Sequence, residues 1–311
     1  MPESNLLKAI LLKLAAALMF TLMSVLVRYV SDAVPLGEIV FFRSAFAILP
    51  VLLIFAWRGE LVSALRTKRP LGHVGRGLIS VAGMFLNFAA LARLPLVDVT
   101  AISFAAPLIT VAFAAIFLGE RVRVYRWTAV GVGFIGVLVM LWPHFDLAHF
   151  TTAGGTVAAI GAACALGSAF TNAGAVVQTR RLTDTETTSS IVVYFSLVCA
   201  LVGFATLPFG WVMPNRLELI ALIMLGICGG LAHILLTESY RHAPASVVAP
   251  FDYSTMLWAA LVGYFIWGEL PTVYVYVGGA IVAATGLFVI WRERQLGLRR
   301  EKESEGPPNV T

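Results

Sequence analysis

A few charged side chains lie inside or at the ends of long apolar runs in this sequence, and they are the residues best able to do chemistry. A charge inside a lipid bilayer costs at least about 2.5–3.5 kcal/mol, so each one is a candidate functional group. We expect two opposite-charge clusters, one at each end of the spanning segments, that act as alternately closing gates. The outer cluster comprises Arg28, Asp32, Glu38 and Arg43, and the inner cluster comprises Glu238, Arg241 and Asp252. The alternative is that these residues lie at the membrane interface, where their side chains snorkel so that the charged groups reach water.

Uncharged polar and aromatic residues in the same runs are candidates for binding a ligand. A buried amide or imidazole, such as that of Asn87 or His233, is costly without a hydrogen-bond partner. Aromatic faces stack on planar ligands, although most of the 20 Phe and 8 Tyr must simply face lipid or neighbouring helices. The predicted substrate-binding residues are Arg43, Asn87, Phe104, His233, Tyr253 and Trp258.

Three residues could couple a proton to the movement of a ligand. His233, Glu238 and Asp252 are titratable, and Glu38 joins the last two as a predicted gating or coupling residue. Exchange or facilitated diffusion needs none of them. The sequence has no glycine-lysine nucleotide motif, no His-Glu-x-x-His and no paired cysteines, so we expect no ATP hydrolysis, no catalytic residue, no metal and no cofactor.

The composition explains where these residues lie. Hydrophobic residues make up 59% of the 311, charged residues only 13%, and the mean hydropathy is +0.88. A helix that crosses a bilayer needs about 20 apolar residues, and only helices or closed barrels can cross one. The runs lack the alternation of barrel strands, so we expect an all-α integral membrane protein with ten transmembrane helices. They lie near 7–30, 37–57, 72–92, 97–118, 125–142, 153–177, 188–209, 217–240, 245–267 and 272–291.

The basic residues predict how the helices are oriented. Most of the 22 Lys and Arg fall in loops on one side of the predicted spans, which the positive-inside rule assigns to the cytoplasm. Both termini are then cytoplasmic, in the cell's inner (plasma) membrane. The net charge of +5 belongs to these loops and does not indicate nucleic-acid binding. Residues 293–311 are predicted to form a disordered cytoplasmic tail.

An internal repeat divides the spans into two halves. The segment from Pro95 to Glu120 resembles the segment from Pro244 to Glu269 at a constant offset, so that Phe104 corresponds to Tyr253. We expect two five-helix repeats, residues 6–143 and 153–292. Because five is odd, the halves enter the membrane in opposite directions, as in many transporters.

Several short motifs carry a family resemblance. They are Glu38-Ile-Val-Phe-Phe-Arg43, Arg69-Pro70 with Arg76-Gly77, Ala106-Pro107, Gly119-Glu120-Arg121 and Gly268-Glu269. In this order the sequence resembles the EamA family of the drug/metabolite transporter superfamily. The resemblance implies a ten-helix secondary transporter that moves a small organic metabolite by alternating access, and not an enzyme.

The first half is most similar to the branch that contains riboflavin and S-adenosylmethionine uptake carriers, particularly at Pro35-x-Gly37-Glu38 and Arg69-Pro70-Leu71-Gly72-His73. We therefore expect uptake of riboflavin or a similar planar heteroaromatic molecule. Export of amino acids or other metabolites is one alternative, and transport of S-adenosylmethionine is a further alternative.

Overall fold

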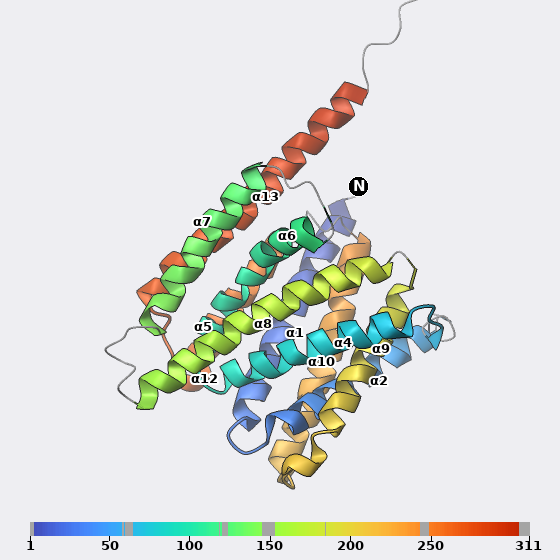
Figure 1. Ribbon diagram of the computed structural model, residues 1–311, viewed down its shortest axis with the longest axis vertical. Helices are drawn as coiled ribbons and strands as arrows, with labels where there is room; N and C mark the ends of the chain where they lie inside the picture. Colours follow the sequence, from blue (N-terminus) through green and yellow to red (C-terminus); the bar gives the residue numbers. More distant parts are fainter. Residues whose placement is uncertain are drawn as a thin grey trace, which may run out of the picture.

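A computed structural model describes residues 3–57, 59, 65–117, 119, 124–144, 153–183, 185–242 and 249–304. Every regular element in these residues is a helix (Figure 1). Six of the ten predicted spans are long and apolar enough, by length and composition, to cross a membrane, and the all-helical structure agrees with the predicted membrane protein. The elements that contain them are α1 (Glu3–Val30), α2 (Leu36–Trp57), α4 (Pro70–Leu91), α5 (Leu96–Ser103) with α6 (Ala105–Phe117), α8 (Ala153–Thr183) and α10 (Arg216–His242).

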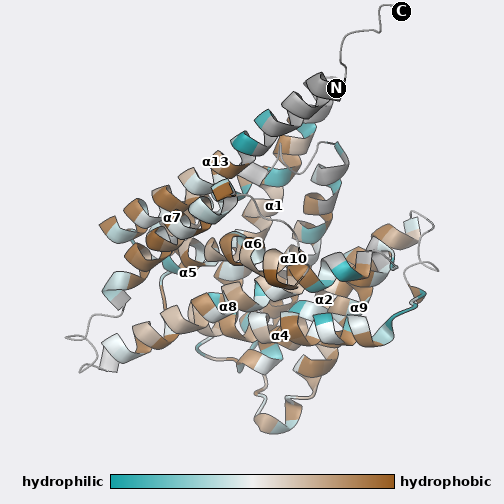
Figure 2. Ribbon diagram, turned by 45° about the horizontal axis from the view of Figure 1, so that its top comes forward, coloured by the Kyte–Doolittle hydropathy of each residue, from teal (hydrophilic) through white to brown (hydrophobic). Residues whose placement is uncertain are grey.

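The remaining elements are shorter, or apolar over only part of their length. The α-helices among them are α7 (Val124–Leu141), α9 (Thr188–Phe204), α12 (Ser254–Trp267) and α13 (Val273–Ser304). Three 3-10 turns, η1 (Trp142–His144), η2 (Leu207–Phe209) and η3 (Ala249–Tyr253), join or precede them. Apolar residues predominate along the helices (Figure 2), and large side chains such as Leu53 and Phe265 face outward, as lipid contact requires.

Two predicted helices are interrupted, and proline accounts for the first interruption. The predicted span 97–118 divides into α5 and α6 at Phe104. Pro107 has no N–H to donate to the carbonyl of Ser103, four residues earlier, and its ring crowds that carbonyl. The predicted span 245–267 begins in the described residues with η3, which contains Pro250, and continues as α12. By contrast, α2 continues through Pro50 without a break.

Helix α13 is longer than the sequence predicts. It extends to Ser304, past the expected end at 292, and therefore covers the first part of the segment predicted to be disordered. This stretch is rich in Arg, Glu, Gln, Lys and Leu, which favour helices, and contains no proline before Pro307. Residues 305–311 lie outside the described residues.

Close helix packing places the polar residues opposite one another. Helix α1 packs along α10, α4 along α8, and α7 along α13 (Figure 1). Helix α10 also packs on α2, where a Cβ at Gly226 would overlap Phe46 and one at Gly230 would overlap Pro50. Small residues let two helix backbones approach closely in a membrane. This approach brings His233 of α10 next to Arg43 of α2.

Candidate substrate-binding cavity

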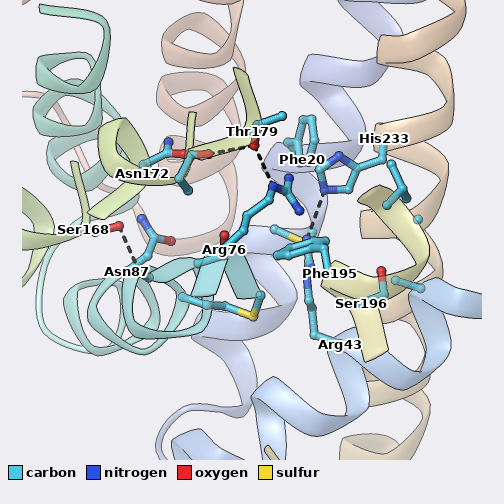
Figure 3. Close-up of a pocket in the computed structure, with 18 of the residues that line it drawn as sticks. Phe20, Arg43, Arg76, Asn87, Ser168, Asn172, Thr179, Phe195, Ser196 and His233 are labelled. Carbon is cyan, nitrogen blue, oxygen red and sulfur yellow. Dashed lines mark hydrogen bonds between the residues drawn. The ribbon is translucent and has the colours of Figure 1, made fainter. Parts of the chain in front are cut away.

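A cavity of about 370 Å³ lies among α1, α2, α4, α8, α9 and α10 (Figure 3). Each of these six helices contributes at least one side chain to the lining, and the lining combines cationic, amide, hydroxyl and aromatic groups. Among the residues that line it are Phe20, Arg43, Arg76, Asn87, Phe88, Ser168, Asn172, Thr179, Phe195, Ser196 and His233. The sequence predicted Arg43, Asn87 and His233 as binding residues, and the structure brings these three together.

Arg43 is the most deeply buried cation of the cavity, with 5% of the residue exposed. Its Nη2 lies 3.2 Å from Nε2 of His233, and its guanidinium carbon lies 5.6 Å from the centre of the Phe195 ring. A guanidinium group can only donate, so Nε2 of His233 must accept and the imidazole proton is assigned to Nδ1. Nε and Nη1 of Arg43 have no hydrogen-bond partner in the described part of the chain.

Arg76 supplies a second cation to the same cavity. Its Nε donates to Oγ1 of Thr179 at 2.6 Å, and its Nη1 donates to the carbonyl oxygen of Ile191 at 3.3 Å. The guanidinium carbon lies 4.9 Å from the centre of the Phe195 ring, so Arg43 and Arg76 both lie near this one ring. Arg76 lies within the predicted span 72–92 but was not among the predicted binding residues. Because α4 begins at Pro70, Arg76 lies about 9 Å along the helix. A charge at that depth in an apolar span is the feature that could have identified Arg76 as a functional residue.

A second cavity of about 660 Å³ adjoins the first and shares Phe20, Met23, Asn87, Asn172 and Val176 with it. The amide groups of Asn87 and Asn172 make no hydrogen bond to the described residues, so both can bind a ligand in either cavity. Sequence reasoning missed Asn172, although an amide inside an apolar span is the same signal that identified Asn87.

The other predicted binding residues lie outside the first cavity. Phe104 lines the second cavity, and its ring centre is 4.9 Å from that of Tyr253. The Tyr253 hydroxyl donates to the carbonyl oxygen of Val282, 3.5 Å away in α13. Trp258 lines neither cavity, and its buried Nε1 has no hydrogen-bond partner in the described residues.

Two ion pairs connect α1 to the region around α12. Nζ of Lys13 lies 2.7 Å from Oδ1 of Asp252, which also lines the second cavity. Arg28 makes two hydrogen bonds to Glu269, from Nη1 to Oε2 at 2.7 Å and from Nη2 to Oε1, and it stacks on Trp267. Lys13 and Arg28 are about 22 Å apart along α1 at 1.5 Å per residue. Phe20, which lines both cavities, lies between them.

The predicted gating carboxylates of α2 and α10 have different partners from those expected. Glu38 is 1% exposed, and its Oε2 accepts from the backbone N–H of Val212 at 3.2 Å. Oε1 of Glu238 lies 4.0 Å from Nδ1 of His242 in the same helix. Arg28 pairs with Glu269 and Arg43 with His233, so neither is paired with Glu38. The side chain of Arg241 and all of Glu120 and Arg121 lie outside the described residues.

A carboxylate in the connection between α8 and α9 anchors the start of α4. Glu186 accepts from the backbone N–H groups of Lys68 at 2.7 Å and Arg69 at 2.8 Å, and from Oγ1 of Thr67 at 3.2 Å. His73 Nε2 lies 3.4 Å away. Burial acts to raise the pKa of Glu186, but these donors and His73 together outweigh it and hold the pKa below its ordinary value.

Comparison with known proteins gives a family and several relatives. The model of the EamA-like transporter family matches residues 7–142 and again residues 159–292. An S-adenosylmethionine uptake transporter of Rickettsia conorii is 29% identical and aligns over 90% of this chain and 91% of its own length. The pseudopaline exporter CntI of Pseudomonas aeruginosa is 32% identical and aligns over 88% of this chain and 92% of its own length. A riboflavin transporter of Rhizobium johnstonii is 28% identical and aligns over 93% of this chain and 91% of its own length.

The fold also matches a solved structure. The match is a crystal structure of a protein that is 21% identical in sequence, with a TM-score of 0.63. The superposition covers 91% of this chain and 98% of the other chain. At this level of identity the match supports the fold alone.

Proposed function

Because the chain belongs to the EamA-like transporter family, as its motifs predicted, we propose that it is a secondary transporter of a small organic metabolite that works by alternating access. The observation that carries this proposal is the polar cavity between the two ion pairs of α1. Buried charges and amides inside membrane helices are expensive, and they are expected where a ligand crosses. The transporter lies in the cell's inner membrane with both termini in the cytoplasm.

An inverted repeat of two five-helix halves is part of this proposal, and three observations support it. The family model matches the chain twice, over nearly equal lengths. The helix contacts have counterparts when the halves are exchanged, since α1 packs on α10 as α8 packs on α4, and α2 packs on α10 as α9 packs on α4. Phe104 and Tyr253, which correspond in the two repeats, contact each other, as residues near a two-fold axis between the halves would.

The two ion pairs are proposed as gates. Each one joins α1 of the first half to η3 or the end of α12 in the second half. Breaking one pair while the other stays formed would open the cavities toward one side of the membrane only. Both pairs are formed in this structure, on either side of the cavities along α1.

The substrate proposed from the sequence is riboflavin or a similar planar heteroaromatic molecule, taken up by the cell. Phe20, Phe88 and Phe195 in the cavity supply aromatic surface for such a ring. Relatives named as transporters of riboflavin and of S-adenosylmethionine, which also carries a planar purine, are consistent with it. The relative named as a pseudopaline exporter favours the alternative of metabolite export.

Flux into proteoliposomes tests the proposed function. The purified chain should take up at least one labelled compound from a panel of riboflavin, S-adenosylmethionine and amino acids, with saturation and with countertransport by unlabelled compound. Liposomes without protein provide the baseline. Uptake that stays at this baseline for every compound, from either membrane face, would contradict the proposal.

A further inference from the structure

We propose that Arg43 and Arg76 form a subsite that binds a carboxylate of the transported molecule, so that the substrate class is a planar heteroaromatic metabolite with a carboxylate. This inference rests on the proposed function and narrows its substrate class to planar heteroaromatic molecules that carry a carboxylate. It therefore favours such a molecule over riboflavin, which has none. It concerns one end of the first cavity, where the two guanidinium groups lie against Phe195.

The charges of this cavity are not balanced by the protein. The guanidinium carbons of Arg43 and Arg76 lie 5.6 and 4.9 Å from the centre of one ring, so they can be no further apart than these two distances together. Among the described residues, no Asp or Glu lines the cavity, and neither arginine has an ion-pair partner. Two like charges in one cavity repel each other, and an anion that contacts both relieves the repulsion and the desolvation.

Arg43 in particular has hydrogen-bonding capacity to spare. The residue is 5% exposed, and its Nε and Nη1 lack partners in the part of the chain that the structure describes. Its contact with His233 cannot supply negative charge, because the imidazole accepts as a neutral ring. A buried guanidinium with unused donors therefore faces a cavity (Figure 3), and an anionic ligand is the group that satisfies it best.

The surroundings favour a carboxylate attached to a flat ring. A carboxylate is the smallest common metabolite anion that can accept from two guanidinium groups at once, and Ser196 adds a hydroxyl to the cavity wall. Asn87 and Asn172 line both cavities and can orient a heteroaromatic edge by donating and accepting. The carboxylate would lie near Phe195, and the ring would extend toward the larger cavity.

Matched ligand pairs test this assignment on the unmodified protein in detergent. S-adenosylmethionine and its decarboxylated analogue differ only in the carboxylate, and riboflavin and riboflavin 5′-phosphate differ only in a phosphate. We expect S-adenosylmethionine to bind roughly 10- to 100-fold more tightly than its decarboxylated analogue, from hydrogen bonds to charged groups. Equal affinities, no binding of either compound, or a preference confined to the phosphate pair would overturn the proposal.

Variants then locate the effect. Arg43→Gln and Arg76→Gln should each remove most of the carboxylate preference, whereas Arg93→Gln, which changes an exposed arginine, should keep it. Retained preference in both cavity variants would overturn the assignment to these residues. The proposed function fails separately: a carboxylate preference in binding without flux would refute transport alone, and riboflavin flux without any carboxylate preference would refute this subsite alone.

Discussion

The ion pair between Arg28 and Glu269 should control access to the cavities from one end. Both side chains are 19% exposed, so the pair is intermediate between a surface pair, worth about 0–1 kcal/mol, and a buried pair, whose disruption costs about 3–5 kcal/mol. Two hydrogen bonds and the stacking on Trp267 place it above a surface pair. We therefore take about 2 kcal/mol as the stabilisation of the closed state that Glu269→Gln removes. This free energy corresponds to about 30-fold in the equilibrium constant between the closed and open states.

This loss predicts a population shift if the pair is formed only when this end is closed. The fraction of molecules open at this end should rise by up to about 30-fold in Glu269→Gln. Ser24 lies one helical turn from Arg28 and lines the second cavity, so Ser24→Cys reports on access. In a background where Cys164, Cys199 and Cys228 are replaced by Ala, a membrane-impermeant maleimide should modify this thiol faster by the same factor.

The controls separate gating from general loosening. The exchanged pair, Arg28→Glu with Glu269→Arg, should return the modification rate close to that of the parent, and Arg93→Gln should not change it. A rate that is unaffected by Glu269→Gln, or an exchanged pair that reacts as fast as the single variant, would show that this ion pair does not control access to the cavities.

Three further predictions concern individual residues. Asp252→Asn should lower the free energy of unfolding more than Lys13→Met does, because the carboxylate is 52% exposed whereas the ammonium is only 2% exposed. Equal losses in denaturant titrations in detergent would contradict this prediction. Glu186→Ala should cost about 1–3 kcal/mol at neutral pH. The folded protein lowers the pKa of Glu186 from 4.5, so the stability that Glu186 contributes should be complete above that pH and be lost as the pH falls through the lowered value. The stabilities of the variant and the parent should therefore converge in acid. A difference in stability that stays constant with pH would contradict this prediction. His233→Gln keeps an acceptor for Arg43 and should leave the pH dependence of uptake unchanged, whereas a flattened profile would indicate that His233 couples protons.

The fold was predictable from the sequence to the extent that it depends on local chemistry. Long apolar runs are sufficient to indicate membrane helices, and a proline such as Pro107 is a local cause of the break at Phe104. The continuation of α13 to Ser304 was missed because polarity was interpreted as disorder, although the residues there favour helix.

The site was predictable only in part, because its partners come from different helices. Arg43, Asn87 and His233 could be identified as costly polar groups within spans, and the cavity contains all three. Their partners could not be assigned from sequence, since the pairs of Arg28 with Glu269 and Lys13 with Asp252 connect residues more than two hundred positions apart. Arg76 was missed although it lies inside the predicted span 72–92, because it is close to the cytoplasmic end of that span, where basic residues are common.

The most direct test of the account is whether closing the cavity stops flux. Val176 lines both cavities, so Val176→Trp should fill the space through which the substrate passes without removing a polar group. Leu201→Trp is the matched control, because Leu201 is 59% exposed on the outside of α9 and lines neither cavity. In proteoliposomes with equal amounts of folded protein, we predict that saturable uptake of the transported compound falls to the protein-free baseline in Val176→Trp and persists in Leu201→Trp. Native flux in Val176→Trp would contradict the assignment of these cavities as the transport pathway.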